Sequence, residues 1–373
     1  MKTVCETNKC AGCMACVDLC PKSAISIKDD LLHYNAVIDS EKCIKCDLCH
    51  KNCQNNQDLI FNSQIEWYQG WAKDDNIRMS SSSGGVASAL AVATIAKNGC
   101  VYSCAFSNGE FVFKCAENYD ELKNFAGSKY VKSNPKGLYK QIEQKLKSNK
   151  DILFIGLPCQ VAALKIVIGD NPHLYTVDLI CHGSPSPKLL DVFLNQYDIK
   201  MANLTDISFR TKNSFQLSSI SQKITPPGVR DRYLIAFLNG LIYTENCYEC
   251  KFARTERVSD ITLGDSWGSN LDENQQKKGI SLILVQSEKG RKLLNEAKLE
   301  LLNVDSSKAV EANHQLKHPS VKPQQRNVFF DGLSKGKSFN SLVKKSYPKQ
   351  CIKQDIKAKL NKFKVKTEGT PDY

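Results

Sequence analysis

Two groups of cysteines near the start of the chain are the residues whose type and spacing carry the clearest chemistry. Each group reads C-x2-C-x2-C-x3-C, first from Cys10 to Cys20 and again from Cys43 to Cys53. Thiolates at such short, regular intervals suit a loop wrapped around a soft metal centre. The repeated spacing therefore predicts two metal centres of the same kind.

Iron–sulfur clusters use every cysteine of these groups. Three closely spaced cysteines fit one corner of an iron–sulfur cube, and in two-cluster ferredoxins the fourth cysteine of each run binds the other cluster. The residue after the second run is Gln54, where the first run has Pro21, and this difference removes no ligand. By the crossing rule, one 4Fe–4S cluster is held by Cys10, Cys13, Cys16 and Cys53, and the other by Cys43, Cys46, Cys49 and Cys20.

Zinc and disulfides are weaker alternatives for the same cysteines. A zinc site usually pairs two C-x2-4-C knuckles and needs four ligands, so the third cysteine of each run has no role in it. A disulfide scaffold needs an oxidising compartment, and nothing in the sequence indicates one. Met1-Lys-Thr-Val-Cys5 contains no apolar leader, and 17 cysteines favour a reducing interior, so we expect a cytoplasmic protein.

Length and composition indicate a soluble globular protein with more than one domain. The 373 residues exceed a typical domain of ~100–200 residues. No stretch approaches the ~18 apolar residues of a membrane-spanning helix. We expect a ferredoxin-like module over 1–57, a first body region over 67–150, a second over 151–330, and a basic tail over 331–373.

The positive charge is concentrated in that tail. The net charge is +12, and residues 331–373 contribute +7 of it through eleven lysines and four acidic residues. Such a balance suits an acidic electron-transfer partner, and weak contact of the tail with a membrane surface is a second reading. A solvated surface segment is the simpler interpretation of the tail. There is no motif for binding nucleic acid.

The body must position any further chemistry, and its pattern predicts how. Residues 152–155 and 174–180 read as buried strands, each followed by a helix, over 160–167 and 187–197. This βαβα order predicts a parallel sheet, whose sites lie beyond the carboxyl ends of the strands. Cys159 and Cys181 follow those ends. Beyond 300 we expect a polar, less regular chain with a short basic helix carrying Ile352, Ile356, Leu360 and Phe363.

A serine- and glycine-rich loop precedes a predicted helix over 86–97. Ser80 to Gly85 leave backbone N–H groups at a helix N-terminus, where a phosphate can bind. The loop is neither a Walker motif nor a dinucleotide fingerprint. Serine caps are common in helices without ligands, so the loop alone is a weak indication.

Four of the remaining cysteines stand out by context. Cys159 and Cys181 follow strands, and Cys247 and Cys250 form a C-x2-C pair. Four thiols from three loops are enough for a third cluster. Buried apolar cysteines beside an isolated pair are an equally good reading on spacing alone.

Several stretches resemble the beta-subunit family of coenzyme F(420) hydrogenases and dehydrogenases, some members of which carry a fused two-cluster ferredoxin. They are Ser82-Ser-Gly-Gly-Val86, Gly156-Leu-Pro-Cys-Gln-Val-Ala-Ala-Leu164, Ile180-Cys-His-Gly183, Asn246-Cys-Tyr-Glu-Cys250 and Asp260-Ile-Thr-Leu-Gly-Asp-Ser-Trp-Gly268. The resemblance implies an α+β or α/β protein, with a small two-cluster module before a mixed-sheet body that binds a flavin and a cluster.

The resemblance also implies cofactors and contacts. It suggests FAD beside a third 4Fe–4S cluster ligated by Cys159, Cys181, Cys247 and Cys250. The implied flavin or substrate contacts are Ser83, Gly84, Gly85, Lys129, Arg210, Asp265 and Trp267. A purely structural role is equally consistent with the sequence for two of them: Asp265 could cap a turn, and Trp267 could be a core side chain. His182, beside Cys181, more simply packs than tunes a cluster.

The function implied is an iron–sulfur flavoprotein oxidoreductase. Electrons would pass from ferredoxin or a similar donor through the clusters to FAD and on to a small organic substrate, with the reverse direction open. Family members act on a deazaflavin or a chlorophyll intermediate, and others accompany polysaccharide genes. The alternatives are an electron-transfer subunit of a larger complex and, in another class, a zinc-stabilised interaction protein.

Overall fold

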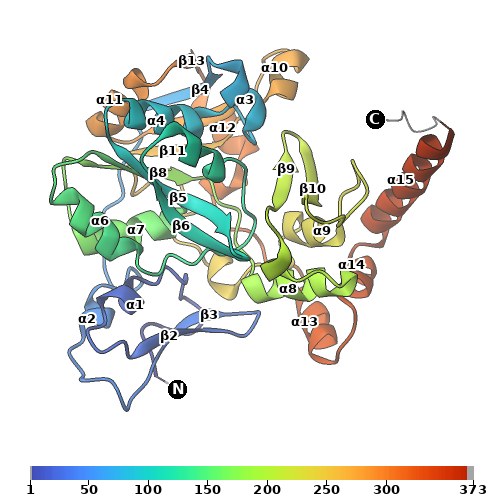
Figure 1. Cartoon of the computed structure of the whole chain (residues 1–373), viewed down its shortest axis with the longest axis horizontal. Helices are drawn as coiled ribbons and strands as arrows, with labels where there is room; N and C mark the ends of the chain where they lie inside the picture. The colour runs from blue at the N-terminus through green and yellow to red at the C-terminus, as the bar shows by residue number, and fades with distance from the viewer. Residues whose placement is uncertain (1, 368–373) are drawn as a thin grey trace.

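The body of the protein is built on one mixed sheet of eight strands. The computed structural model describes residues 2–367, so the last six residues of the predicted tail lie outside it. The strand order is β13-β4-β12-β11-β8-β7-β5-β6, and the central strands β11, β8, β7 and β5 are parallel (Figure 1). These strands are β4 Glu66–Ala72, β5 Cys100–Ser107, β6 Glu110–Ala116, β7 Ile152–Gly156, β8 Leu174–Leu179, β11 Ile261–Asp265, β12 Ser281–Val285 and β13 Leu299–Asn303.

Helices cover both faces of the sheet, which agrees with the burial of every residue of β7. Ile152 and Phe154 pack on one face, with α6 Leu138–Leu146 and α7 Pro158–Ile168. Leu153 and Ile155 pack on the other face, with α4 Val86–Ala96 and α11 Glu288–Glu296. Strand side chains alternate between faces, so a strand that is apolar throughout is buried on both. The predicted fold class, a mixed α/β body behind a small module, is confirmed.

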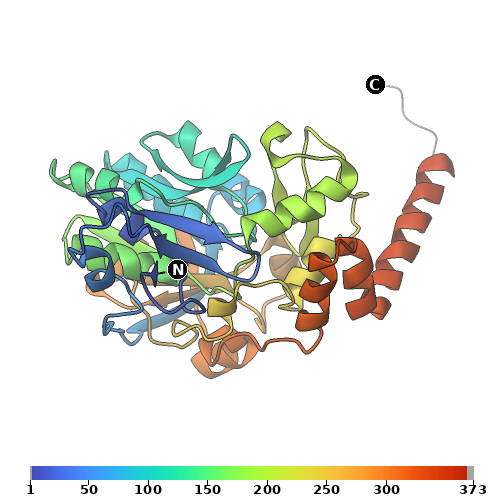
Figure 2. The same cartoon turned by 90° about the horizontal axis from the view of Figure 1, so that it is seen from below.

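The module at the N-terminus is small and contacts the body closely. It contains β1 Lys2–Thr3, α1 Ala15–Leu19, β2 Ile25–Asp29, β3 Tyr34–Ile38 and α2 Leu48–Lys51, with the sheet order β1-β3-β2. Figures 1 and 2 show it in blue beside α6 and α7. Asp18 of α1 accepts hydrogen bonds from the N–H groups of Gly137 and Tyr139 at the start of α6, at 2.7 and 3.3 Å. The module therefore caps a body helix.

A second lobe completes the body and corrects the prediction for the last third of the chain. Its core gathers α8 Pro187–Leu194, the hairpin of β9 Ser208–Thr211 and β10 Ser214–Ser218, α9 Arg232–Leu238, α13 Arg326–Ser334 and α14 Phe339–Ser346. The expectation of an irregular chain beyond 300 is wrong. Phe339 and Val343 are buried in this lobe, so the start of the tail is structural.

The remaining helices lie at the edges. They are α3 Asp75–Ser80, α5 Tyr119–Leu122, α10 Glu273–Lys278, α12 Ser306–Ala312 and α15 Pro348–Thr367. Figure 1 shows α15 extending away from the lobe. Its residues Ile352, Ile356 and Leu360 are exposed. The side chain of Phe363 lies outside the described residues. No helix within residues 2–367 is long and apolar enough to cross a membrane.

Candidate iron–sulfur and cofactor sites

The two cysteine loops of the module have the same backbone conformation. The second residue after the first cysteine has positive φ in both runs, +70° at Gly12 and +56° at Lys45. The fourth residue after that cysteine does as well, at +60° for Met14 and +64° for Asp47. Residues other than glycine rarely adopt this conformation, so its repetition at matching positions shows that the spacing imposes one loop shape.

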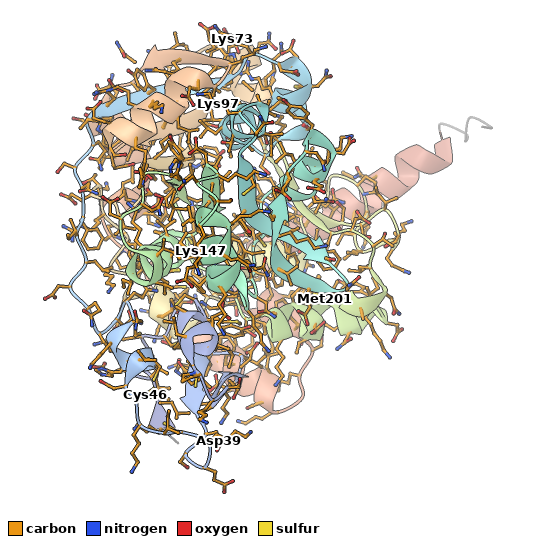
Figure 3. The ribbon with its side chains drawn as sticks, turned by 60° about the vertical axis from the view of Figure 1, so that its left-hand side comes forward. Asp39, Cys46, Lys73, Lys97, Lys147 and Met201 are labelled. Carbon is orange, nitrogen blue, oxygen red and sulfur yellow. The ribbon has the colours of Figure 1, made fainter. Side chains whose placement is uncertain are left out.

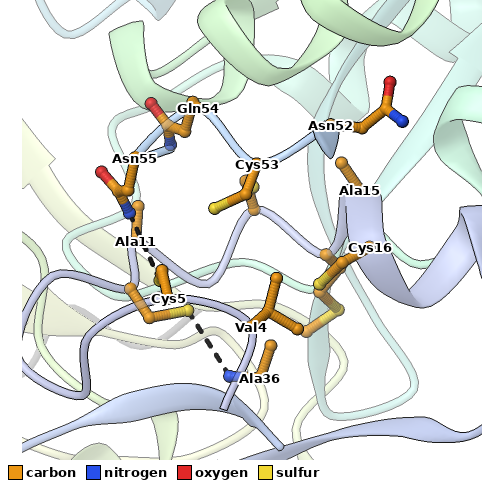
Figure 4. A pocket seen from close by; sticks show the side chains of 13 residues that line it. Val4, Cys5, Ala11, Ala15, Cys16, Ala36, Asn52, Cys53, Gln54 and Asn55 are labelled. Carbon is orange, nitrogen blue, oxygen red and sulfur yellow. Dashed lines mark hydrogen bonds between the residues drawn. The ribbon is translucent and has the colours of Figure 1, made fainter. Parts of the chain in front are cut away.

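The first loop forms a pocket against the start of the chain, which we call the inner pocket. Its lining includes Cys10, Cys13, Cys16 and Cys53, the four cysteines that the crossing rule assigns to one cluster (Figure 4). The backbone N–H of Ala36 donates to Cys10 Sγ at 3.4 Å. Burial raises the pKa of the Cys13 thiol to about 12, so its thiolate needs a cationic partner there.

A fifth thiol also lines the inner pocket. Cys5 is buried, and Asn55 points its amide at Cys5 Sγ, with Nδ2 at 3.6 Å (Figure 4). The neighbouring Cys5 thiol lowers the pKa of both Cys10 and Cys53. Sequence spacing assigned Cys5 no role, because it stands outside both runs.

The second loop forms the outer pocket, at the surface of the module. It is lined by Cys20, Cys43, Cys46 and Cys49, the other set of the crossing rule. The backbone N–H of Ala24 donates to Cys20 Sγ at 3.3 Å. Cys46 is exposed, and Figure 3 shows it at the end of the module that faces away from the body. Ile44 and Leu48 beside it are 57% and 42% exposed.

The third cysteine set comprises Cys159, Cys181, Cys247 and Cys250, and the fold brings it together. Cys159 lies in the first turn of α7, directly after β7, and Cys181 follows β8, the parallel neighbour of β7. The N–H of Thr244 donates to the Ser184 carbonyl at 3.2 Å, which joins the loops that carry Cys247 and Cys181. These contacts place four thiols from three loops in one region.

Cys247 of this set is buried and the other three cysteines are partly buried, and the thiols influence one another electrostatically. Burial raises the pKa of Cys159 well above its ordinary value, and Cys181 and Cys250 add to the rise. Burial also raises the pKa of Cys181 to about 12 and that of Cys250 to about 11, with Cys247 adding in both cases. Thiols that resist ionisation in this way suit a cluster, whose iron supplies the positive charge that stabilises thiolates.

Within residues 2–367, no three His, Cys, Asp or Glu side chains are placed to hold one metal ion. The inner and outer pockets instead each have four or more cysteines spread around a central space. Thiolates distributed around a space match a cube of iron and sulfur better than a single ion.

The residues implied for flavin contacts converge at one end of the sheet. Ser83 Oγ donates to the Ile280 carbonyl at 2.9 Å, and the Gly84 N–H donates to Ser281 Oγ at 3.1 Å. A Cβ on Gly84 would lie 2.5 Å from the Gly70 carbonyl oxygen, so only glycine fits. Gly85 has a φ of +83° and begins α4. The loop is thus held by the ends of β4 and β12, and the Gly84 N–H is already bonded within the protein.

Positive side chains gather around this loop. Arg210 forms a bidentate ion pair with Asp265, at 2.6 and 2.9 Å, and its guanidinium lies 5.9 Å from the ring of Trp267. Lys212 donates to the Ser83 carbonyl at 3.0 Å. Burial, together with nearby Arg78 and Arg210, lowers the pKa of Lys212 to about 8. Several cations around a serine–glycine loop suit an anionic group such as a pyrophosphate.

Lys129 lies against the same loop. The N–H of Ser128 donates to Ser82 Oγ at 2.9 Å, and Lys129 Nζ donates to the carbonyls of Phe125 and Ala126 at 2.7 and 3.0 Å. Burial lowers the pKa of Lys129 to about 8. The structure therefore groups all seven implied contacts in one region.

Comparison with known proteins finds family models that match two segments of the chain. Residues 9–57 match the family model described as 4Fe-4S dicluster domain. Residues 149–307 match the model described as the C terminus of the coenzyme F(420) hydrogenase/dehydrogenase beta subunit. The chain therefore contains one segment that matches each of these two family models.

The chain was also compared with solved structures and with curated protein sequences. A chain of the F(420)-reducing NiFe hydrogenase complex from Methanosarcina barkeri aligns with a TM-score of 0.47 and 14% identity, covering 70% of this chain and 91% of that chain. No curated protein sequence matches the chain.

The structure adds residues around the dicluster domain that sequence reasoning missed. Lys132 of the body is 5% exposed, and its Nζ donates to the Ala11 carbonyl of the inner loop at 2.9 Å. Lys251, beside Cys250 of the beta-subunit region, donates to the Gln54 carbonyl. Lysines carry no signature spacing, so only a fold that sets the two regions side by side reveals these contacts.

Proposed function

We propose that the chain is an iron–sulfur flavoprotein that passes electrons from a ferredoxin-like donor to a small organic substrate. The observation that carries this proposal is the convergence of three cysteine sets, two in the dicluster domain and one in the beta-subunit region. Bound clusters would move electrons singly, and FAD would convert them to paired transfer to substrate.

The cysteines would hold the clusters in three different settings. Cys46 of the outer pocket is exposed, which suits entry of electrons from a partner. The inner pocket lies between the outer pocket and the body, and the third set lies within the body. Among the charges that add to the raised pKa of Cys159, whose main cause is burial, is that of Cys13 in the inner pocket. This proximity supports a relay from module to body.

The loop from Ser83 to Gly85 would hold the flavin phosphates. Lys212 and Lys129 would offset their negative charge, and Trp267, which is 39% exposed, would cover part of the ring system or the substrate. Asp265 would hold Arg210 in position through its bidentate ion pair. The substrate class that we favour is a deazaflavin or a metabolite of polysaccharide synthesis.

A second candidate is an electron-transfer subunit of a larger complex, without substrate chemistry of its own. The family model that matches residues 149–307 is described as a hydrogenase/dehydrogenase beta subunit. In addition, the exposed side chains of Ile44 and Leu48 form apolar surface beside the outer pocket. The two candidates differ in whether the purified chain turns over a two-electron acceptor.

Anaerobic purification with iron, sulfide and flavin analysis tests the proposal. We expect about twelve iron atoms per chain, four for each of three clusters, and one FAD. The Cys159→Ser variant should lose about four irons and its acceptor reduction, whereas the Cys104→Ser variant, at a cysteine outside the three sets, should keep both. A flavin-free wild type, or unchanged iron in Cys159→Ser, contradicts the corresponding part of the proposal.

A further inference from the structure

One buried lysine stands between the inner pocket and the third cysteine set. We propose that Lys132 is a positioning residue whose single ammonium raises the reduction potentials of the inner cluster and the third cluster together. This inference rests on the proposed function, because both clusters belong to it. The outer cluster would lie beyond the influence of this charge.

Lys132 makes one hydrogen bond through its ammonium and another through its backbone, to loops of the two sites. Its Nζ donates to the carbonyl of Ala11, which lines the inner pocket between Cys10 and Cys13. Its backbone N–H donates to the Pro185 carbonyl at 2.9 Å, in the loop that follows Cys181. One residue therefore connects the inner loop to a loop of the third set.

The two sites beside Lys132 share one packed region. Cys13 of the inner pocket and Cys159 and Cys250 of the third set border the same buried apolar cluster. The Lys132 ammonium, bonded to the Ala11 carbonyl, therefore lies near thiols of both sets. A fixed positive charge in that position favours added negative charge at both sites.

The interface around Lys132 is fixed by neighbouring contacts. The Tyr139 hydroxyl donates to the Cys13 carbonyl at 2.5 Å, and the Asp18 carboxylate accepts from the N–H groups of Gly137 and Tyr139. Tyr139 is almost fully buried. These bonds prevent the module from moving away from the lysine.

The sign of the effect follows from electrostatics. Reduction adds one electron to a cluster without forming or breaking a bond, and a nearby fixed cation stabilises the added charge. Lys132 is 5% exposed, so solvent screens its ammonium little. Net charge and hydrogen bonding near a cluster are the means by which proteins set its potential.

Redox titration of the loaded, full-length protein, followed by electron paramagnetic resonance, tests this inference. Lys132→Gln keeps a donor for the Ala11 carbonyl but removes the charge, and Lys132→Arg keeps the charge. In the Gln variant we expect the midpoint potentials of the inner and third clusters to fall by ~59 mV or more, which is a tenfold shift of a one-electron redox equilibrium. The potential of the outer cluster should stay near its wild-type value. In the Arg variant all three potentials should stay near their wild-type values.

Lys188→Gln is the matched control. Lys188 also belongs to the body and donates to a carbonyl of the module, that of Asp29 at 3.3 Å, but neither residue lines a cysteine pocket. Its substitution should leave all potentials unchanged. Unmoved potentials in Lys132→Gln, an equal fall of all three, or the same shifts in Lys188→Gln would overturn the inference.

Cluster content separates this inference from the proposed function. A wild type with only two clusters overturns the proposed third cluster and the shared role of Lys132 with it. A wild type with three clusters whose potentials ignore Lys132→Gln overturns the role of Lys132 alone. If the Gln variant loses clusters, the Arg variant decides: retained clusters with wild-type potentials support a role of the charge, and loss of the same clusters in the Arg variant overturns the inference.

Discussion

The inner and outer pockets are built from one sequence motif but occupy opposite environments. Both loops place positive-φ residues at matching positions and receive a backbone N–H on a cysteine sulfur. The inner pocket is bordered by the body through Lys132 and Tyr139, and it contains a fifth thiol, Cys5. The outer pocket has an exposed cysteine, Cys46, with exposed apolar neighbours.

This difference shows that ligand spacing and cluster role are separate properties. Spacing fixes the loop shape, and the surroundings of each loop fix its solvent access and local charge. An exposed site suits exchange with a partner, and a site enclosed by the body suits transfer within the chain. The predictions below test whether the two pockets differ as their surroundings require.

The largest effect should come from removing the fourth cysteine of each run. Because the runs cross, Cys20→Ser should empty the outer pocket, although Cys20 follows the inner loop in sequence. Cys53→Ser should empty the inner pocket once Cys5, the neighbouring thiol, is also replaced by serine. Each protein should lose about four irons, and redox titration should show which cluster is missing.

The response to Lys132→Gln shows which cluster remains in each of these proteins. Cys20→Ser should keep the inner cluster, so adding Lys132→Gln should lower the potential of its remaining module cluster. Cys5→Ser/Cys53→Ser should keep the outer cluster, whose potential should not change when Lys132→Gln is added. The reverse pattern would mean that each run binds its own cluster without crossing.

The next effect concerns loss of iron to oxidants. Ferricyanide or air should remove iron from the outer cluster several times faster than from the inner cluster, because Cys46 is exposed and Cys16 and Cys53 are buried. The measurement is the decay of each resonance signal with time. The Cys20→Ser protein provides the control, since its fast phase should be absent. Equal rates in the wild type would remove the distinction between the pockets.

Sequence predicted much of this arrangement because it depends on short, regular spacing. The apolar run of β7 and the βα order around it place Cys159 and Cys181 at neighbouring strand ends. Asn108-Gly109 forms a hairpin turn, which this residue pair favours, with both residues at positive φ, +53° and +77°. Local periodicity and turn chemistry suffice for such features.

Contacts between distant segments were beyond sequence reasoning. Helices α12 and α14 are capped by ordinary polar residues and bury few apolar side chains each. Their pattern is therefore faint until β12 supplies a surface for α12 and α9 supplies one for α14. Lys132 and Asp18 gain their roles only because the module docks beside α6, which no local pattern encodes.

Asp18 and Lys51 occupy equivalent positions in the two runs and give a sharper test of that docking. The buried carboxylate of Asp18 accepts from Gly137 and Tyr139 at the N-terminus of α6, where negative charge is favoured. Asp18→Asn should lower the free energy of unfolding by about 1–3 kcal/mol, since a buried N–H loses its acceptor. Lys51 is exposed, so Lys51→Gln should change it by less than about 0.5 kcal/mol.

Anaerobic urea denaturation, followed by cluster absorbance and by tryptophan fluorescence of the body, makes this measurement. Because α6 belongs to the body, Asp18→Asn should lower the midpoint reported by both signals. A fall in the cluster signal alone would mean that the module is stabilised independently of the body.

Gly12 and Lys45 give the smallest and most local comparison. A Cβ on Gly12 would lie 2.3 Å from Cδ1 of the Tyr34 ring, and φ is +70° there. Gly12→Ala should therefore cost about 1–2 kcal/mol from the backbone alone, plus displacement of the ring. Lys45 adopts the same conformation without glycine, so Lys45→Gly should relieve strain and stabilise the outer loop by about 0.5 kcal/mol after its entropy cost.

Thermal or urea midpoints of the two variants, each with its clusters loaded, measure this difference. Opposite signs at matching positions would show that one backbone shape is imposed on both loops and that only their neighbours differ. If Gly12→Ala were neutral, the inner loop would have to relax away from Tyr34, and the rigid enclosure on which the inner pocket and the role of Lys132 depend would not hold.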